Sequence, residues 1–304
     1  MAGSFMHHGR AYALLLATMV FWGGNAIAGK LAVGHVSPML LTMARWGLAF
    51  VILLALGWPR LKADWYVARK HVLLLSMLGM VGFTVFNIAL YCALLYTTAI
   101  NVSIEQAGMP MLIFLANFLL FRQHVSAAQI AGVVLSVAGI ALTASHGDPM
   151  RLLALDVNFG DALMLLAAIL YAGYTVALRF KPQLHWQSLM IMLTGSAFVT
   201  SLPFAMGEFA YGAGILPDTR GWLVIVYTVI FPSILGQMFY IRGVELIGAN
   251  RAGLFINLVP IFGTLLSILL LGESFHLYHA VALAMVMGGI WLAEHSGRKL
   301  ARRA

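Results

Sequence analysis

The chain has 304 residues, of which 62% are hydrophobic and 9% are charged, and its formal net charge is +8 at pH 7. A soluble domain carries about a quarter charged residues, so this composition excludes an ordinary soluble protein and indicates one embedded in a membrane. The lysines and arginines are scattered over short loops and do not form a basic domain. We therefore attribute the positive charge to membrane topology and anionic headgroups, and expect a lipid bilayer but no nucleic acid as partner.

Ten apolar segments follow one another along the chain, each about as long as a helix that crosses a bilayer. They cover residues 11–33, 38–57, 72–96, 101–121, 127–146, 158–178, 185–205, 221–241, 252–271 and 276–295. The third and fourth are separated by little more than "YTTAIN", so their division rests on length. We predict an all-α integral membrane protein with ten transmembrane helices, located as a multi-pass protein in the inner (plasma) membrane.

The loops between these segments differ in charge on the two sides of the membrane. With the N-terminus inside, 14 lysines and arginines fall on the inner side and three on the outer side, while Arg45 lies within a span. Loops that face the cytoplasm carry an excess of Lys and Arg. We therefore predict that both termini are cytoplasmic, with a tail at 1–10 and a basic tail at 298–304.

The two halves of the chain repeat each other. "PMLIFLANFLLFRQHVSAAQIAGVVLSVAGI" aligns without gaps on "PIFGTLLSILLLGESFHLYHAVALAMVMGGI" at an offset of 150, and an earlier stretch aligns at an offset of 149. We predict one five-helix repeat over 11–148 and a second over 149–297. Because five is odd, the two repeats run in opposite directions. Inverted repeats are typical of secondary transporters, whose binding site lies near the membrane midplane between the halves.

Three segments have a recognisable pattern: "FWGGNAIAGKLAVGHVSPMLLTMARWGLAFVILLAL", "ALLYTTAINVSIEQAGMPMLIFLANFLLF" and the region around the Leu-Gly-Glu turn at 271–273. They resemble the EamA-type ten-helix branch of the drug/metabolite transporter superfamily. The family pattern falls on Trp22, Gly23, Lys30, Ser37, Pro38 and Arg45. The first repeat departs from it, with Arg122-Gln123 where the second has Gly272-Glu273.

The resemblance implies transport of small metabolites by alternating access without ATP hydrolysis, and it is strongest to the YddG-like amino-acid and metabolite exporters. It also implies a structural or gating role for Arg45. Consistent with this, the sequence has no G-x-x-x-x-G-K-[ST] nucleotide-binding loop.

The segment "SIEQAGMP" at 103–110 holds Glu105, the only charged residue between Val72 and Phe121. A charged side chain inside a bilayer is costly and needs a reason. In one interpretation Glu105 caps the start of the fourth helix; in the other it faces a cavity, where it and Gln106 meet a substrate amine or a proton. Glu105 is also a candidate partner for Arg45 if their helices are neighbours.

Further polar and aromatic side chains lie inside the spans at helical spacing, as either cavity lining or packing between helices. The candidate substrate-binding residues besides Glu105 and Gln106 are Trp22, Asn25, Asn87, Tyr91, Tyr171, Ser233, Gln237, Tyr240 and Asn257. Prolines remove a backbone hydrogen bond and bend helices, so Pro110, Pro232 and Pro260 are candidate structural or gating positions. "EQAGMP" and "INLVP" are related polar-then-proline elements of the two repeats, where we expect interrupted helices.

All ten histidines fall in tails, loops or helix ends, so we expect none in the interior, no metal site and no cofactor. Without clustered carboxylates or a nucleophile elbow, a membrane-embedded lipid-modifying enzyme is a remote alternative, and the protein is expected not to be an enzyme. A scaffold or receptor is a third option. We expect an exporter of small metabolites, with amino acids as the leading substrates, working as a monomer or homodimer. The alternative is export or facilitated movement of other small solutes or cationic drugs, with proton coupling through Glu105.

Overall fold

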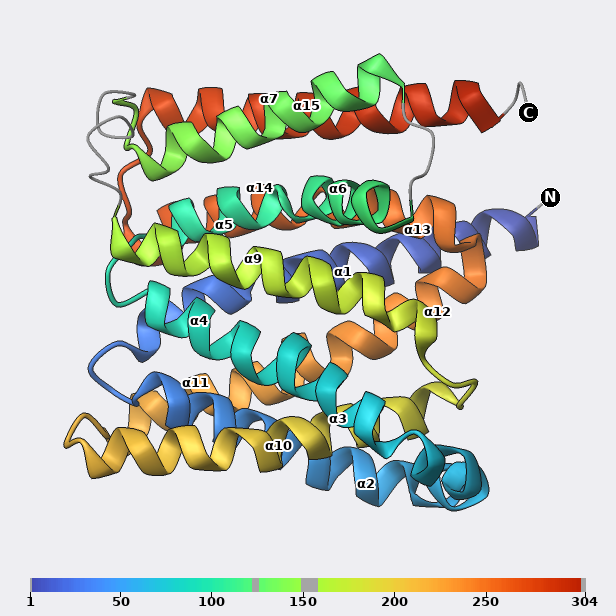
Figure 1. Cartoon of the computed structure of the whole chain (residues 1–304), viewed down its shortest axis with the longest axis vertical. Coiled ribbons are helices and arrows are strands. Elements are labelled where there is room, and N and C mark those ends of the chain that lie inside the picture. Colours follow the sequence, from blue (N-terminus) through green and yellow to red (C-terminus); the bar gives the residue numbers. More distant parts are fainter. Residues whose placement is uncertain (1, 122–125, 149–157, 302–304) are drawn as a thin grey trace.

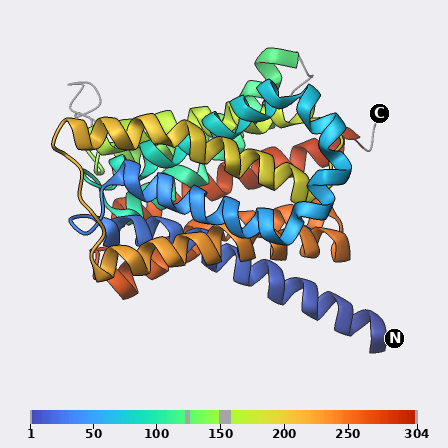
Figure 2. The ribbon, with the colours of Figure 1, turned by 90° about the horizontal axis from the view of Figure 1, so that it is seen from below.

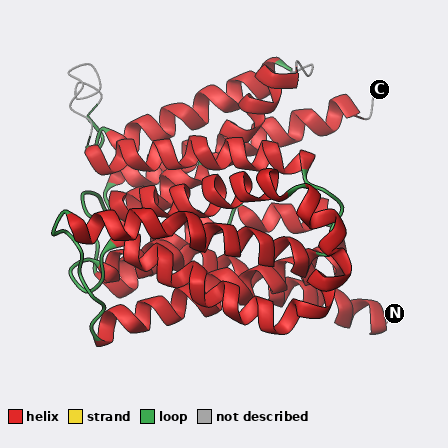
Figure 3. Ribbon diagram, turned by 60° about the horizontal axis from the view of Figure 1, so that its bottom comes forward, coloured by secondary structure: helices red, strands yellow, loops and turns green. Residues whose placement is uncertain are grey.

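A computed structural model of the chain describes residues 2–121, 126–148 and 158–301, and this part is helical with short connecting loops (Figure 3). The first repeat contains α1 (Ala2–Ala32), α2 (Pro38–Lys70), α3 (Val72–Gly79), η1 (Met80–Val85), α4 (Phe86–Ala93), α5 (Ala99–Ala107), α6 (Met109–Phe121) and α7 (Ala127–Ala144). The second contains α9 (Phe159–Ala177), η2 (Leu178–Phe180), α10 (Trp186–Ala210), α11 (Thr219–Thr228), η3 (Val229–Leu235), α12 (Gly236–Ile247), α13 (Ala249–Ile256), α14 (Val259–Leu266), η4 (Ser267–Leu271) and α15 (Leu277–Ala301).

The ten predicted spans are present. Within the described residues nine helical stretches are long and apolar enough to cross a membrane, and a shorter apolar stretch, Leu277–Ala293, supplies the tenth. The second span is longer than predicted, because its helix continues through the polar residues that follow 57 and ends at Lys70. Both ends of the described chain lie at the same end of the bundle, as an even number of spans requires (Figure 1). The first turns of α1 project beyond the other helices (Figure 2).

The helices pair across the two repeats in a symmetric way. The layer at the top of Figure 1 consists of α7 and α15, and the layer at the bottom contains α2 and α10, so each layer takes one helix from each repeat. Between them, α1 packs against α12 and α14, while its counterpart α9 packs against α4 and α6. The pattern is the one expected of two inverted repeats that embrace each other.

Carboxylates fix the α2–α10 pair at both ends. Glu208, near the end of α10, accepts hydrogen bonds from the backbone N–H groups of Met39 (3.2 Å) and Leu40 (3.1 Å) in the first turn of α2. Asp64, near the end of α2, accepts one of 2.8 Å from the backbone N–H of His185, the N-cap of α10. A carboxylate at a helix N-terminus satisfies free N–H groups and meets the positive end of the helix dipole. Each helix therefore caps the other.

Small residues let α7 and α15 approach closely. A Cβ atom added at Gly132 would lie 2.5 Å from the carbonyl oxygen of Gly289, and the Ser136 hydroxyl donates a 3.3 Å hydrogen bond to the Val286 carbonyl. Glycine and serine permit such contacts because they keep the backbones within reach of each other. The small-residue face of the fifth span is thus used inside the chain.

The fourth and ninth spans are interrupted at corresponding positions, as expected. In the fourth, α5 ends at Ala107 and α6 begins at Met109; in the ninth, α13 ends at Ile256 and α14 begins at Val259. Pro110 and Pro260 each lie in the first turn of the helix after the break, where a missing N–H is tolerated. The third and eighth spans also match, since both contain a π-helical segment, η1 and η3, and the two segments begin 149 residues apart.

Candidate functional site

In two of the π-helical segments, η1 and η3, a backbone carbonyl accepts a hydrogen bond from a side chain of another element. The Phe83 carbonyl in η1 accepts hydrogen bonds from the Trp46 indole (3.2 Å) and the Asn87 amide (2.7 Å). The Pro232 carbonyl in η3 accepts one of 3.2 Å from the Trp22 indole. A π-helical turn shifts the register of a helix and is frequent at functional sites. Here the turns lie beside the interior polar residues of the third and eighth spans.

A buried arginine gathers four of the predicted site residues. Arg45 of α2 donates from Nε to the Ser233 hydroxyl at 2.8 Å. Its Nη1 donates to Asn25 Oδ1 at 2.9 Å, Asn87 Oδ1 at 2.8 Å and Tyr91 OH at 2.6 Å. The Tyr91 hydroxyl in turn donates to Asn25 Oδ1 at 3.1 Å. We call these five residues the arginine cluster; its members come from α1, α2, α4 and η3, and so from both repeats.

Among the described residues, no acidic side chain forms a hydrogen bond or ion pair with the guanidinium of the arginine cluster. Arg45 is only 5% exposed, and its hydrogen-bonding partners are neutral amides and hydroxyls. Its guanidinium also lies 4.6 Å from the centre of the neighbouring Trp46 ring. The remaining nitrogen, Nη2, has no hydrogen-bond partner among the described residues. A buried guanidinium with an unused N–H pair is a ready donor for an anionic group.

The expected pairing of Arg45 with Glu105 is wrong. Both carboxylate oxygens of Glu105 are buried without a hydrogen-bond partner, and the partners of Arg45 come from elsewhere. The side chains of Arg45 and of the Glu105 face of α5 point toward different helices. Asn101, one turn before Glu105 on the same face of α5, points toward α9 and α15, whereas Arg45 points toward α1, α4 and η3.

Aromatic rings line the neighbourhood of the arginine cluster. The Trp22 and Tyr240 rings are 5.3 Å apart, and the Tyr171 ring lies 4.9 Å from Phe86 and 5.4 Å from Tyr174. The structure thus places Trp22 of the first span against Tyr240 of the eighth, and Tyr171 of the sixth span against Phe86, the neighbour of Asn87 in the third.

Three other polar residues of the predicted site do not belong to the arginine cluster. Gln106, Gln237 and Asn257 are half-buried and make no side-chain hydrogen bond within the described part of the chain. Asn257 ends α13 at the break before Pro260, and Pro232 lies inside η3. These residues are not held by protein partners.

The helix-capping interpretation of Glu105 is also wrong. The fourth span begins earlier than predicted, at Ala99, with Thr98 as its N-cap, so Glu105 lies beyond the first turn. The capping carboxylate belongs to Glu273 of the Leu-Gly-Glu turn, which accepts hydrogen bonds from the backbone N–H groups of Ala99 (2.8 Å) and Ile100 (2.9 Å). Glu105 is only 1% exposed and needs another explanation.

A second buried polar cluster was not predicted. Thr97, Asn101, Asp161 and His279 are between 0% and 4% exposed and form one hydrogen-bonded chain. The expectation of no interior histidine is therefore wrong, because His279 begins the tenth span but is covered by its neighbours. The sequence signal for Asp161 is that it is the only charged residue between 158 and 178. The described residues contain no group of three or more His, Cys, Asp or Glu side chains that could hold a metal ion.

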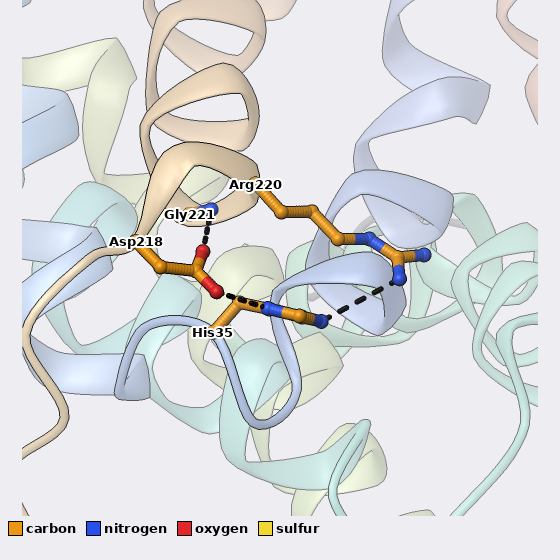
Figure 4. A network of polar contacts seen from close by, with 4 residues as sticks. All are labelled: His35, Asp218, Arg220 and Gly221. Atoms are coloured by element: carbon orange, nitrogen blue, oxygen red, sulfur yellow. Dashed lines mark hydrogen bonds and ion pairs between the residues drawn. The ribbon is translucent and has the colours of Figure 1, made fainter.

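A pocket of about 320 Å³ lies at the C-terminal end of α1 and is lined by Lys30, Leu31, Val33, His35, Arg220, Leu271 and Glu273. At its edge the Asp218 carboxylate accepts hydrogen bonds from the Gly221 backbone N–H (2.8 Å) and the His35 ring (2.6 Å), and Arg220 Nη1 lies 3.5 Å from the other ring nitrogen (Figure 4). The Gly221 N–H and the His35 ring hold the pKa of Asp218 below its usual range. These contacts tie the end of α1 to the start of α11.

Known proteins resemble the chain along nearly its whole length. The Bacillus subtilis protein named "Uncharacterized transporter YetK" is 27% identical, over 93% of this chain and 86% of that protein. The Salmonella typhimurium protein named "Uncharacterized inner membrane transporter YicL" is 24% identical, over 95% of this chain and 97% of that protein. Another Salmonella typhimurium protein, named "Probable amino-acid metabolite efflux pump", is 25% identical, over 92% of this chain and 93% of that protein.

The fold is shared with a solved crystal structure that has a TM-score of 0.63 and 20% identity and covers 95% of this chain and 98% of the other. The model of the EamA-like transporter family matches the chain twice, at residues 9–145 and 158–294. Two matches of this length leave few residues outside them. The chain therefore belongs to the EamA-like transporter family and is a multi-pass membrane transporter.

Proposed function

We propose that the protein is a secondary transporter of the inner membrane that exports small metabolites, with amino acids as its main substrates. The family membership and the relative named as an amino-acid metabolite efflux pump support transport and this substrate class. Relatives named as transporters also favour transport over an enzymatic activity. The termini lie in the cytoplasm, in keeping with the distribution of lysine and arginine.

The observation that carries the substrate class is the unused Nη2 of Arg45. A guanidinium binds a carboxylate with two parallel hydrogen bonds, and a charge-assisted bond is about twice as strong as a neutral one. In the arginine cluster the neutral partners hold the guanidinium in place without neutralising it. The carboxylate of an amino acid supplies the missing counter-charge. Arg45 is then a substrate-binding residue, and no longer only the structural residue that the resemblance implies.

Aromatic and amide groups of the same spans offer further contacts. Trp22, whose indole donates to the Pro232 carbonyl beside Ser233, packs beside Tyr240, and Tyr171 lies beside Phe86; these rings offer apolar faces to a side chain. Gln237 follows Ser233 by one helical turn, and its amide has no hydrogen-bond partner among the described residues, so it can receive an amino group. The breaks before Pro110 and Pro260 lie at matching places in the two repeats and serve as the flexible points for alternating access. Rocking of one repeat against the other exposes the region to each side in turn.

Counterflow in proteoliposomes tests this function. Vesicles loaded with an unlabelled amino acid are diluted into the same labelled compound, and a panel of amino acids is compared with their decarboxylated amines. We expect exchange of amino acids but not of the amines, because the amines lack the group that Arg45 binds. Exchange of cationic amines alone would contradict the proposal and favour the alternative of cationic drug export, which the positive charge of Arg45 opposes.

An arginine-to-lysine pair provides the matched variants. Arg45→Lys keeps the charge but loses the planar bidentate geometry, so we expect the apparent affinity to fall about 10-fold or more. Arg242→Lys makes the same change in an exposed pair, where Arg242 lies 2.6 Å from Glu245, and is expected to transport normally. Equal affinities in the wild type and Arg45→Lys would remove Arg45 from the site.

A further inference from the structure

The second buried cluster lies where helices of both repeats meet. Thr97 follows α4, Asn101 is in the first turn of α5, Asp161 is in the first turn of α9, and His279 is near the start of α15. The Thr97 hydroxyl donates to Asp161 Oδ1, and the Asn101 amide donates to Thr97 Oγ1 at 3.1 Å and to Asp161 Oδ1 at 3.4 Å. These helix ends lie at the end of the bundle opposite the chain termini, the end predicted to face outward (Figure 1).

Within this cluster the hydrogen bonds hold His279 as a neutral ring that donates a hydrogen bond. The backbone N–H of His276 donates to His279 Nδ1 at 3.0 Å, so this nitrogen carries no proton. The ring proton is then on Nε2, which lies 3.1 Å from Asn101 Oδ1 and donates to it. Because the Asn101 oxygen accepts from His279, its amide nitrogen must turn toward Thr97 and Asp161. The histidine therefore orients the donors that reach Asp161 and does not itself change charge without losing the His276 contact.

Two carboxyl groups at this place have oxygens without partners. Asp161 Oδ2 and both oxygens of Glu105 are buried without a hydrogen bond, and each residue is only 1% exposed. Glu105 follows Asn101 by one helical turn on the same face of α5, and the two carboxyl groups interact electrostatically. An ionised carboxylate in such a place costs several kcal/mol, and two of them repel each other. A proton shared by the pair removes one of the two charges and therefore stabilises the pair.

Among the described residues no lysine or arginine forms a hydrogen bond or ion pair with Glu105 or Asp161, and His146 is the group of opposite charge that interacts electrostatically with Asp161. The titratable groups that face the pair from α15, the segment before it and the turn after α7 are His276, Tyr278, His279 and His146. Beyond the start of α5, Glu273 is used as a helix cap, and Lys30 donates to the carbonyls of Leu94 (2.8 Å) and Thr97 (2.7 Å). The described helices α6, α7 and α14 also border this region and carry no titratable side chain.

We propose that Glu105 and Asp161 form a proton-binding site whose occupancy is coupled to substrate movement. The proton arrives from water at the outer end, converts one carboxylate of the pair to a carboxylic acid and lets the ends of α5, α9 and α15 close. Loss of the proton leaves two repelling charges, which separates the first repeat from the second at this end. The inference rests on the proposed transport function, and it makes the protein an antiporter that exchanges an outgoing metabolite for an incoming proton.

The experiment compares two fluxes in proteoliposomes that contain the full chain. The first is accumulation of a labelled amino acid in vesicles whose interior is more acidic than the medium; the second is exchange at equal pH. We expect Glu105→Gln and Asp161→Asn each to lower the ratio of accumulation to exchange at least 10-fold. Glu245→Gln makes the same chemical change on an exposed carboxylate and is expected to leave the ratio unchanged.

An unchanged ratio in both variants would overturn the proton site, as would accumulation driven by a sodium gradient in place of the pH gradient. Absence of exchange in the wild-type protein would instead contradict the transport function. A measurement on the wild-type protein alone tests the proposal even if the variants do not fold. Infrared spectroscopy should show the stretching band of a protonated, buried carboxyl group that disappears at alkaline pH and is missing in Glu105→Gln. A wild-type spectrum without any such titrating band would overturn the proposal.

Discussion

The two buried clusters of this protein differ in the sign of their charge and in how far protein groups hydrogen-bond to it. The arginine cluster surrounds a positive charge with four neutral acceptors and leaves one nitrogen unused. The cluster around Asp161 gives one carboxylate oxygen two donors and leaves its other oxygen, and both of Glu105, without any. The guanidinium keeps its charge because protein groups hydrogen-bond to it, so it can bind an anionic ligand. A buried carboxylate without hydrogen-bond donors is costly in its charged form, so it binds a proton. In the two proposals above, the arginine cluster therefore binds the substrate and the cluster around Asp161 binds the proton.

The largest effect is expected when the charge is removed from the arginine cluster. Arg45→Met deletes the guanidinium and leaves amide and hydroxyl groups of Asn25, Asn87 and Ser233 without their shared donor. Each hydrogen bond to a charged group contributes about 1.5–3 kcal/mol, so we expect exchange to fall by about 100-fold and the thermal unfolding temperature to drop. Exchange assays and unfolding in detergent measure both. Normal exchange by Arg45→Met would show that the arginine cluster does not bind the substrate.

The hydroxyl group of Tyr91, and not the packing of its ring, is expected to stabilise Arg45. Tyr91→Phe removes the acceptor 2.6 Å from Arg45 Nη1 while keeping the buried ring. We expect a loss of about 1.5–3 kcal/mol in unfolding free energy, together with weaker substrate binding. Tyr211→Phe, at a ring that is 92% exposed directly after α10, changes the same group and serves as the control for thermal unfolding.

The cluster around Asp161 should respond in the opposite direction. Glu105→Leu removes a buried carboxyl group that makes no hydrogen bond, so no partner is left behind. We expect the protein to gain about 1–3 kcal/mol of stability, although it loses proton-driven accumulation. Thermal unfolding at neutral pH checks the gain. A destabilised Glu105→Leu protein would mean that the carboxyl group is bound by something the fold supplies.

The smallest effect concerns an exposed carboxylate that is neither buried nor unpartnered. Asp218 has a depressed pKa because the Gly221 N–H and the His35 ring stabilise its charged form. Its contribution to stability is therefore complete above the unfolded-state pKa of about 3.9 and is lost as the pH falls through the lower folded-state pKa. Asp218→Asn should make the unfolding temperature slightly less sensitive to acid. An identical acid profile for the two proteins would contradict this assignment.

The sequence predicts the ten spans, their repeat and the interrupted fourth and ninth helices because these depend on local composition and on proline and glycine. It also places Asn25, Asn87, Tyr91 and Ser233 among the candidate site residues, since each is a polar residue in an apolar span. It does not identify what these residues bind. Their common partner, Arg45, becomes visible only when four helices from two repeats are brought together.

The errors have a shared physical origin. Asp161 and His279 lie in the first turns of α9 and α15, and Glu105 lies near the predicted start of the fourth span. At such positions a polar residue is usually a cap or is solvated, and sequence alone gives no reason to bury it. Burial follows from the packing of α5 between α9, α14 and α15, which are distant in the chain. The capping role expected for Glu105 belongs to Glu273, which is 174 residues from Ala99. Long-range pairing of this kind leaves no periodic trace in a single sequence.

The matching positions of η1 and η3 bear on the origin of the two halves. A π-helical turn contains one residue more than an α-helical turn, so each segment has the length that the insertion of one residue into a regular helix would produce. The segments begin 149 residues apart, the same offset that aligns the ends of α5 and α13. One insertion in a single five-helix ancestor, copied when its gene was duplicated and fused, explains both segments at once. The distortion beside the binding region is then older than the protein's present length.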